Sequence, residues 1–247
     1  MLSTQKYKNS VPLCYVKNGP KMGAIVYYND VKPTDIMDTM RFSKDGDFAL
    51  IPNSKTRQTI GVFGPSGVGK STWIHDYCVS FNKFIKYPIS LFSHLDSDET
   101  LDKVKGISRV KLDEDLIIEP LDMENDFYDS LVIFDDAISG LDKRIDAELT
   151  KFKSQVLQLG RHPNIYYIES VHQGLGGPKT KLLLSETTGI VLFPIGGDIH
   201  TMRTLLTKYC GVNPKEAEKI ITSSSRWVYI NKSFPRFVLS SDKIYLL

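Results

Sequence analysis

From about residue 48 onward, the chain alternates between short apolar runs and stretches with helical periodicity. The apolar runs are short and are bounded by turn residues, which predicts buried strands. They lie at residues 59–63, 89–93, 131–134, 165–171 and 189–193, with a weaker run at 110–112. Strands that alternate with helical patterns are typical of βαβ units. The pattern therefore predicts an α/β fold with a mostly parallel central sheet and flanking helices.

Two helical patterns lie between these strands. Residues 70–84 predict one helix. In the second, apolar residues recur in steps of four and three from Ile145 to Leu159, the signature of an amphipathic helix. Gly160 follows directly, at the position where a helix C-cap is expected.

The two ends of the chain differ from this core. Residues 1–47 are mixed in character and predict an extension that covers a sheet edge or touches a partner. Residues 48–247 are expected to form one domain with its core at about 55–198. After that core, two short helices and an antiparallel hairpin are expected at 201–209, 214–222, 227–231 and 237–239.

Composition argues against a membrane-spanning, secreted or zinc-stabilised protein. Among 247 residues, 41% are hydrophobic, and no apolar run approaches the roughly 18 residues of a membrane span. The first residues lack the layout of a signal peptide, so we expect the protein to stay inside a cell. Cys14, Cys78 and Cys210 form no CxxC pair, which argues against a structural zinc. A net charge of +2 is too balanced to indicate a nucleic-acid binder by bulk charge alone.

The strongest chemical signal is GPSGVGKS at residues 64–71, which fits the P-loop pattern GxxxxGK[ST]. It lies between a predicted strand and a predicted helix, where glycines let backbone N–H groups turn toward a triphosphate. Lys70 is expected to reach the β- and γ-phosphates, and the Ser71 hydroxyl to bind Mg²⁺. The residues expected to contact the nucleotide are Gly64, Pro65, Ser66, Gly67, Val68, Gly69, Lys70, Ser71 and Thr72.

A second signal is the pair Asp135 and Asp136 at the end of the apolar run 131–134. Carboxylates at the carboxyl end of a parallel strand face the crevice where ligands bind in open α/β sheets. We expect Asp135 to hold Mg²⁺ and Asp136 to orient and deprotonate the attacking water. Taken without the P-loop, the same pattern also fits a strand-end turn.

Two further polar residues are candidates for the same chemistry. Gln173 follows the strand at 165–171 and would sense the γ-phosphate if that strand lies between the two motif strands; the alternative is a satisfied strand-end amide. Arg161 follows Gly160 and could reach the γ-phosphate of a neighbouring subunit; the alternative is a salt bridge. The guanine-reading NKxD pattern is absent, which disfavours GTPase chemistry and makes ATP the expected nucleotide.

Taken in order, residues 64–71, VIFDDA at 132–137, LGRHPN at 159–164 and SVHQ at 170–173 resemble the FtsK–HerA superfamily. More narrowly, the set is similar to genome-packaging ATPases of large DNA viruses and virophages. The resemblance implies a P-loop core of the additional-strand, RecA-like type, in which a sensor strand separates the two motif strands. It also implies a homo-oligomeric ring, pentamer or hexamer, around double-stranded DNA, with Arg161 acting in trans. Many relatives carry Glu where this chain has Asp136. The assignment of Asp136 as the base is therefore less secure than that of Asp135 as the metal ligand.

We therefore expect a Mg²⁺-dependent, DNA-stimulated ATPase that moves double-stranded viral DNA into a preformed capsid. The alternatives are another P-loop DNA translocase or helicase-like ATPase, or a nucleotide-gated assembly protein that is not a motor. Expected partners beyond DNA are capsid-vertex or internal-membrane proteins, met in the host cytoplasm or viral factory and transiently at the packaging vertex. Basic residues that could contact DNA phosphates are Lys103, Lys105, Arg109, Lys111, Lys143, Arg144, Lys179 and Lys181.

Overall fold

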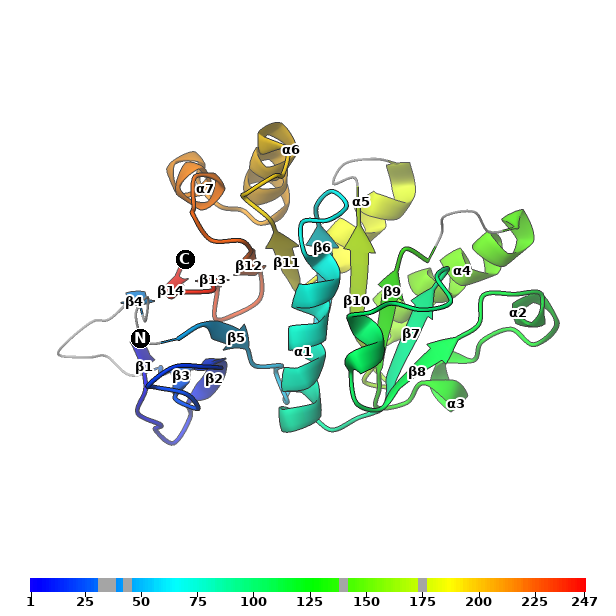
Figure 1. Cartoon of the computed structure of the whole chain (residues 1–247), viewed down its shortest axis with the longest axis horizontal. Helices are drawn as coiled ribbons and strands as arrows, with labels where there is room; N and C mark the ends of the chain where they lie inside the picture. Colours follow the sequence, from blue (N-terminus) through cyan, green and yellow to red (C-terminus); the bar gives the residue numbers. More distant parts are fainter. Residues whose placement is uncertain (31–38, 42–45, 138–141, 173–176) are drawn as a thin grey trace.

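A ten-stranded sheet dominates the part of the chain that the computed structural model describes, namely residues 1–30, 39–41, 46–137, 142–172 and 177–247 (Figure 1). Its parallel part runs in the order β11 (Gly189–Leu192), β6 (Thr59–Phe63), β10 (Tyr166–Val171), β9 (Leu131–Asp135), β7 (Ile89–Ser93) and β8 (Ile107–Val110). Strand β10 lies between the strand that ends in the P-loop and the strand that ends in the aspartate pair. The predicted fold class is therefore confirmed, including the inserted sensor strand.

The sheet continues beyond β11 with antiparallel strands. In order, these are β12 (Val228–Asn231), β13 (Phe237–Ser240), β14 (Lys243–Leu246) and β4 (Thr39–Arg41). The hairpin of β12 and β13 was predicted, whereas β14 and β4 were not. Strand β4 comes from the N-terminal part of the chain and covers the outer edge of β14, an edge that would otherwise expose unpaired backbone groups.

A second, smaller sheet is formed by the N-terminal residues. Its antiparallel order is β1 (Leu2–Ser3), β3 (Ile25–Tyr28), β2 (Val11–Val16) and β5 (Phe48–Leu50). Buried residues of this sheet, such as Val16 and Phe48, share one hydrophobic cluster with Tyr229 and Phe237 of the large sheet. The expected boundary between an extension and an ATPase domain at residue 48 stays a prediction.

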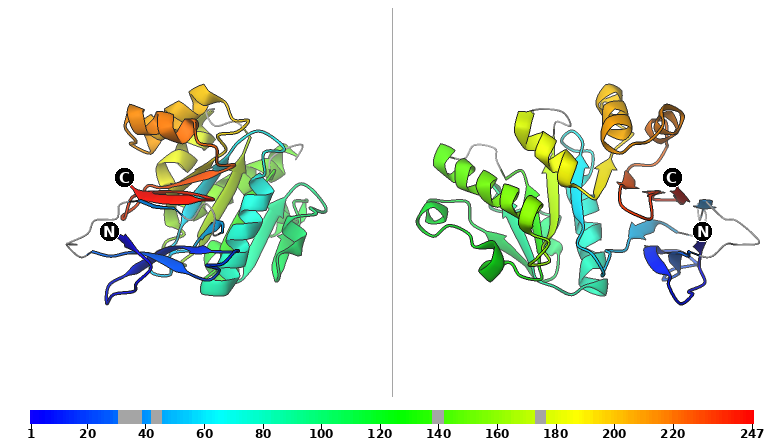
Figure 2. Two further views of the ribbon diagram at one scale, coloured as in Figure 1. Left: turned by 60° about the vertical axis from the view of Figure 1, so that its left-hand side comes forward. Right: turned by 180° about the vertical axis from the view of Figure 1, so that it is seen from behind.

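Helices cover both faces of the parallel sheet. On one face, α1 (Lys70–Phe84) buries Ile74 and Phe81 against strand residues such as Ile133 and Ile168. On the other face lie α4 (Lys143–Leu159) and α5 (Gly177–Glu186), which Figure 2 shows in front of the sheet when the molecule is seen from behind. The predicted C-cap of α4 is confirmed, because the Gly160 N–H donates to the Val156 carbonyl at 3.0 Å.

The remaining elements are short. They are η1 (Leu101–Lys103), α2 (Asp115–Ile118), α3 (Met123–Asp126), α6 (Ile199–Thr204), the π-helical turn η2 (Leu205–Tyr209) and α7 (Pro214–Ile221). Strand β8 ends at Val110, where the weak run at 110–112 was expected to begin. Within the described ranges, no helix is long and apolar enough to cross a membrane.

Candidate nucleotide-binding and hydrolysis site

The P-loop connects the end of β6 to the first turn of α1, as its sequence predicts. Gly67 and Gly69 have φ angles of 78° and 107°, in the region that residues with a Cβ rarely adopt. Gly69 is the N-cap of α1, and no side chain caps that helix end. The free N–H groups of the first turn and the positive end of the helix dipole are therefore available to an anion such as a phosphate.

Lys70 is the cation of this loop, and only 7% of its surface is exposed. Its Nζ donates to the Gly64 carbonyl at 3.0 Å and to the Pro65 carbonyl at 3.1 Å, so the side chain reaches back across the loop. Burial lowers the pKa of Lys70, while the carboxylates of Asp136 and Asp135 act in the opposite direction. The ammonium thus lies inside the loop and close to both aspartates.

Asp135 ends β9 with 4% of its surface exposed, and β10 brings Ser170 beside it. Burial raises the pKa of Asp135 above its ordinary value, and the Ser170 hydroxyl and the Lys70 ammonium act against this shift. The buried Ser170 hydroxyl completes no well-formed hydrogen bond with any described residue. A carboxylate, the Ser71 hydroxyl and the buried Ser170 hydroxyl beside that carboxylate suit a hydrated Mg²⁺ ion, which prefers oxygen ligands and keeps several waters.

The described residues contain no cluster of three or more His, Cys, Asp or Glu side chains with metal-binding geometry. A P-loop magnesium site needs no such cluster, because one hydroxyl, phosphate oxygens and water supply most of its ligands. The residues present therefore fit this cation, and the assignment of Ser71 and Asp135 as its protein ligands stays a prediction.

His172 joins Asp136 to Lys70, and the sequence patterns did not identify it. Its Nε2 hydrogen-bonds with the Asp136 carboxylate, and its Nδ1 lies 3.3 Å from the Lys70 Nζ. Asp136 itself has a φ angle of 48°, an uncommon backbone conformation that turns the chain sharply after β9. The available signal was the polar stretch after the strand, which drew attention to Gln173; that residue lies outside the described part of the chain.

Arg161 lies at the opposite edge of the same parallel sheet. It follows α4 and precedes β10, so it is at the amino ends of the strands, whereas the P-loop follows the carboxyl end of β6 (Figure 1). Its side chain is exposed, and none of the described residues forms a hydrogen bond or ion pair with its guanidinium. Arg161 therefore cannot serve the P-loop of its own chain.

The loop that carries Arg161 is held from two directions. Arg57 donates to the carbonyls of Val156 and Leu157, both at 2.7 Å, and to that of Ile165 at 3.2 Å. On the other side, the Asn164 amide donates to the Asp129 carboxylate at 2.6 Å. A side chain at Gly160 would approach the Arg57 guanidinium to 2.6 Å, which explains the glycine of the LGRHPN stretch.

Glu169 interrupts the otherwise apolar β10 without joining the catalytic groups. It forms a largely buried ion pair with Lys153 of α4 and accepts a hydrogen bond from the Tyr167 hydroxyl. Alternation along β10 puts Glu169 on the α4 face, whereas Ser170 faces α1 and the P-loop. This carboxylate is therefore structural.

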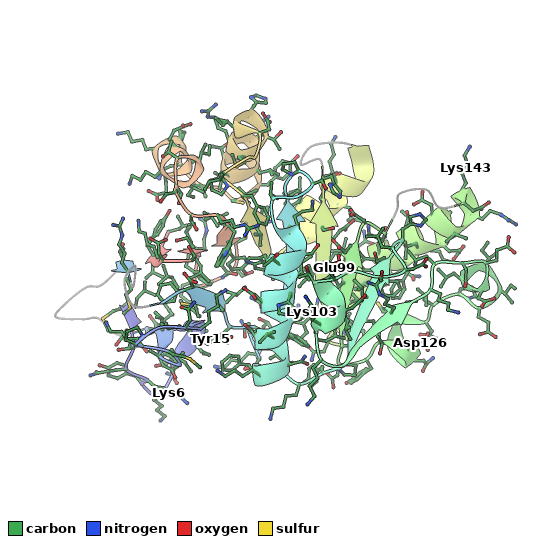
Figure 3. The ribbon with its side chains drawn as sticks, viewed as in Figure 1. Lys6, Tyr15, Glu99, Lys103, Asp126 and Lys143 are labelled. Carbon is green, nitrogen blue, oxygen red and sulfur yellow. The ribbon has the colours of Figure 1, made fainter. Side chains whose placement is uncertain are left out.

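The predicted DNA-contacting residues fall into two groups. Arg109 of β8 is held by Asp102 at 2.7 Å and by the Leu95 carbonyl at 2.8 Å, so its charge is used by the segment between β7 and β8. Arg144 lies within 3.2 Å of Asp142 and 3.6 Å of Glu114. Of the lysines predicted to contact DNA, those with described side chains are all exposed: Lys103, Lys105, Lys111, Lys143 and Lys181. Lys143 projects from the start of α4 (Figure 3), whereas the side chain of Lys179 is outside those described.

A cavity of about 470 Å³ adjoins the start of the P-loop on the side away from α1. Its described lining consists of strand and helix residues at the carboxyl edge of the sheet, together with His172, Gly64 and Pro65. The beginning of the loop is therefore less tightly packed than its end, where α1 begins.

Comparison with known proteins gives one relative in sequence and a set of similar folds. No protein-family model matches the chain. Protein V3 of Sputnik virophage, which is uncharacterized, is 30% identical over 234 residues, covering 94% of this chain and 93% of V3. The monomer of the conjugation coupling protein TcpA of pCW3, solved with ATPγS, has a TM-score of 0.53 at 11% identity and covers 94% of this chain and 77% of TcpA.

The genome packaging NTPase B204 of Sulfolobus turreted icosahedral virus 2, solved with ATPγS, is also similar. Its TM-score is 0.49 at 14% identity, over 76% of this chain and 96% of B204.

Proposed function

This chain belongs to the same protein family as V3 of Sputnik virophage, and we propose that it is an ATP-hydrolysing motor subunit that moves double-stranded viral DNA into a preformed capsid during virion assembly. The motif set that resembles packaging ATPases of the FtsK–HerA type supports this function. The arrangement of the fold around these motifs supports it as well.

One observation carries the proposal. Lys70, Asp135 and Asp136 gather at the carboxyl edge of the parallel sheet, while the exposed Arg161 lies at its amino edge. An exposed arginine on a well-held loop, at the end of the sheet opposite its own P-loop, suits a site that two copies share. A ring of such copies is the arrangement in which each subunit receives an arginine from its neighbour.

The residues of one chain would divide the chemistry as follows. Lys70 and the N–H groups at the start of α1 bind the β- and γ-phosphates of ATP. Ser71 and Asp135 hold Mg²⁺, which supplies charge neutralisation at the phosphate oxygens when it is bound. Asp136, oriented by His172, holds the attacking water and accepts its proton. Arg161 of the adjacent copy stabilises the negative charge that develops on the transferred phosphate.

His172 compensates for the short side chain of Asp136. An aspartate is one methylene shorter than the glutamate of many relatives, so it needs help to position a water. The hydrogen bond from the imidazole fixes the Asp136 carboxylate, and the imidazole itself is a second polar group at the same place.

The test is ATP turnover measured against protein concentration, with and without long double-stranded DNA. Wild type, Lys70→Ala and Arg161→Ala are compared. Arg203→Ala is the control because, among the described residues, the Arg203 guanidinium is paired only with Glu218, in an exposed ion pair at 2.6 Å. We expect turnover that rises faster than linearly with concentration, increases with DNA and is lost in both site variants. Mixing Lys70→Ala with Arg161→Ala should restore part of the activity, because one chain keeps the P-loop and the other keeps the arginine.

Turnover that is linear in protein, indifferent to DNA and unchanged in Arg161→Ala would refute the shared site. The alternative of a nucleotide-gated assembly protein predicts stoichiometric ATP binding without sustained turnover. Another DNA translocase would retain the ATPase results but would fail to package DNA into capsids in a reconstituted assembly.

The proposal includes a ring of five or six copies that contacts proteins of the capsid vertex. It would act in the host cytoplasm or viral factory, at the packaging vertex. The exposed lysines named above are its candidates for contacts to DNA phosphates.

A further inference from the structure

Arg226 contacts the P-loop from a distant part of the chain, the segment that joins α7 to β12. Its Nε donates to the Val68 carbonyl at 3.2 Å, across 158 residues of sequence. A Cβ on Gly69 would lie 2.9 Å from one terminal nitrogen of the guanidinium and 3.2 Å from its central carbon. The guanidinium therefore lies directly against the N-cap of α1.

The flanking residues fix the position of this arginine. Ser225 is buried, and its hydroxyl donates to the Trp227 carbonyl at 2.8 Å. The Trp227 ring meets the edge of Trp73 of α1 at a centroid distance of 6.4 Å. The backbone on both sides of Arg226 is thus anchored, so the contact with the loop does not depend on a free chain segment.

The charge of Arg226 has no counterion among the described residues. Its side chain is exposed, and the contact given above is made to an uncharged carbonyl. The N-terminus of a helix is its positive end, and Lys70 adds a second positive charge close by. A guanidinium brought to such a place without a carboxylate indicates that an anion completes the arrangement.

The sheet order shows which part of a nucleotide this anion would be. Strand β6 leads into the P-loop, with β10 and β9 on one side and β11 and β12 on the other. The groups assigned to the transferred phosphate, Asp135, Asp136 and His172, follow β9 and β10. Arg226 precedes β12 and so approaches the loop from the other side.

We propose that Arg226 binds the non-transferred phosphates of the nucleotide held by the P-loop of its own chain. This inference rests on the proposed ATPase function. It assigns a second arginine to the site, one that acts within a single chain, whereas Arg161 acts only between chains.

The experiment measures binding of ATPγS, ADP and inorganic tripolyphosphate, each with Mg²⁺, by displacement of a fluorescent ATP analogue. The proteins are wild type, Arg226→Ala, Arg226→Lys and the control Arg203→Ala. We expect Arg226→Ala to weaken all three ligands by about tenfold to a hundredfold, the range for losing a charge-assisted hydrogen bond. Arg226→Lys should recover part of the affinity, and Arg203→Ala should match wild type.

Each other result has a definite meaning. If ADP and ATPγS bind more weakly to Arg226→Ala while tripolyphosphate is unaffected, Arg226 contacts the nucleoside and the phosphate assignment is wrong. If all three bind as in wild type, the arginine only braces the loop and the inference fails while the proposed function stands. Lys70→Ala should bind none of the three ligands. A wild type that binds no nucleotide would overturn both proposals.

Discussion

Replacing Arg57 with alanine should lower the stability of the fold and the turnover of the proposed shared site, and should leave nucleotide affinity unchanged. The guanidinium donates to three backbone carbonyls at the end of α4 and the start of β10, two of them at 2.7 Å and one at 3.2 Å. Burial lowers the pKa of Arg57, with Glu186 acting in the opposite direction, so these bonds are made partly out of water. Hydrogen bonds to charged groups contribute about 1.5–3 kcal/mol each, and water would recover part of the loss at a half-buried site.

We therefore expect Arg57→Ala to lower the free energy of unfolding by about 2–4 kcal/mol. For a domain of this size, that corresponds to a fall in melting temperature of about 5–15 °C. Because Arg57 also fixes the loop that carries Arg161, turnover of the oligomer should fall at temperatures where the variant is still folded. Nucleotide affinity should stay near that of wild type, since the P-loop lies at the other end of β6.

The assays are thermal unfolding, nucleotide titration and ATP turnover at a temperature well below both melting transitions. Arg144→Ala is the matched control for stability, because its ion pairs with Asp142 and Glu114 are exposed, and such pairs contribute about 0–1 kcal/mol. The reasoning fails if Arg57→Ala unfolds within about 0.5 kcal/mol of wild type. If the variant loses stability but the oligomer keeps full turnover, Arg57 does not position the loop that carries Arg161 for catalysis.

Three further predictions concern the groups around the sheet. Burial raises the pKa of Asp135, so its ionised form opposes folding and stability decreases as pH rises through the raised folded-state pKa. Asp135→Asn should therefore raise the melting temperature of the nucleotide-free protein at neutral pH by about 2–6 °C. The same substitution should abolish Mg²⁺-dependent turnover. Glu169→Gln should lower the free energy of unfolding by about 3–5 kcal/mol in urea titrations, because it leaves the buried Lys153 unpaired, and should leave ATP affinity unchanged. His172→Ala should lower kcat by about a hundredfold with little change in KM, and an unchanged single-turnover rate would show that Asp136 needs no partner.

Local signals were sufficient to predict the parallel core. The strands that end in the P-loop and in Asp135 lie within one residue of their predicted bounds, because each is a continuous buried run with a strong turn signal behind it. The amphipathic period of α4 was equally clear, and its end at Gly160 followed from the glycine. The run near Val110 was displaced because β8 is a partly exposed edge strand with a weak apolar pattern.

The contacts that complete the site join parts of the chain that are far apart in sequence. Arg57 meets the carbonyl of Leu157 across 100 residues, and Arg226 meets that of Val68 across 158. Neither arginine lies in a motif, and periodicity gives no information about which carbonyl a distant guanidinium reaches. His172 was within reach of prediction, since it follows the sensor strand, but its partner Asp136 is chosen by the order of strands in the sheet. The pairing of β4 with β14 was missed for the same reason.

Strand β6 connects the P-loop to the loop that carries Arg161, the two half-sites that one subunit would contribute to the proposed ring. At its carboxyl end it leads into the P-loop, and two residues before its amino end Arg57 holds the loop that carries Arg161. The strand is five residues long and buried throughout, so its two ends cannot move independently without disturbing the core. In the proposed ring, the position of the arginine that reaches one neighbour would therefore be tied to the strand that leads into the P-loop. In a ring, this connection links each site to the next through the sheet itself, without requiring a separate moving domain.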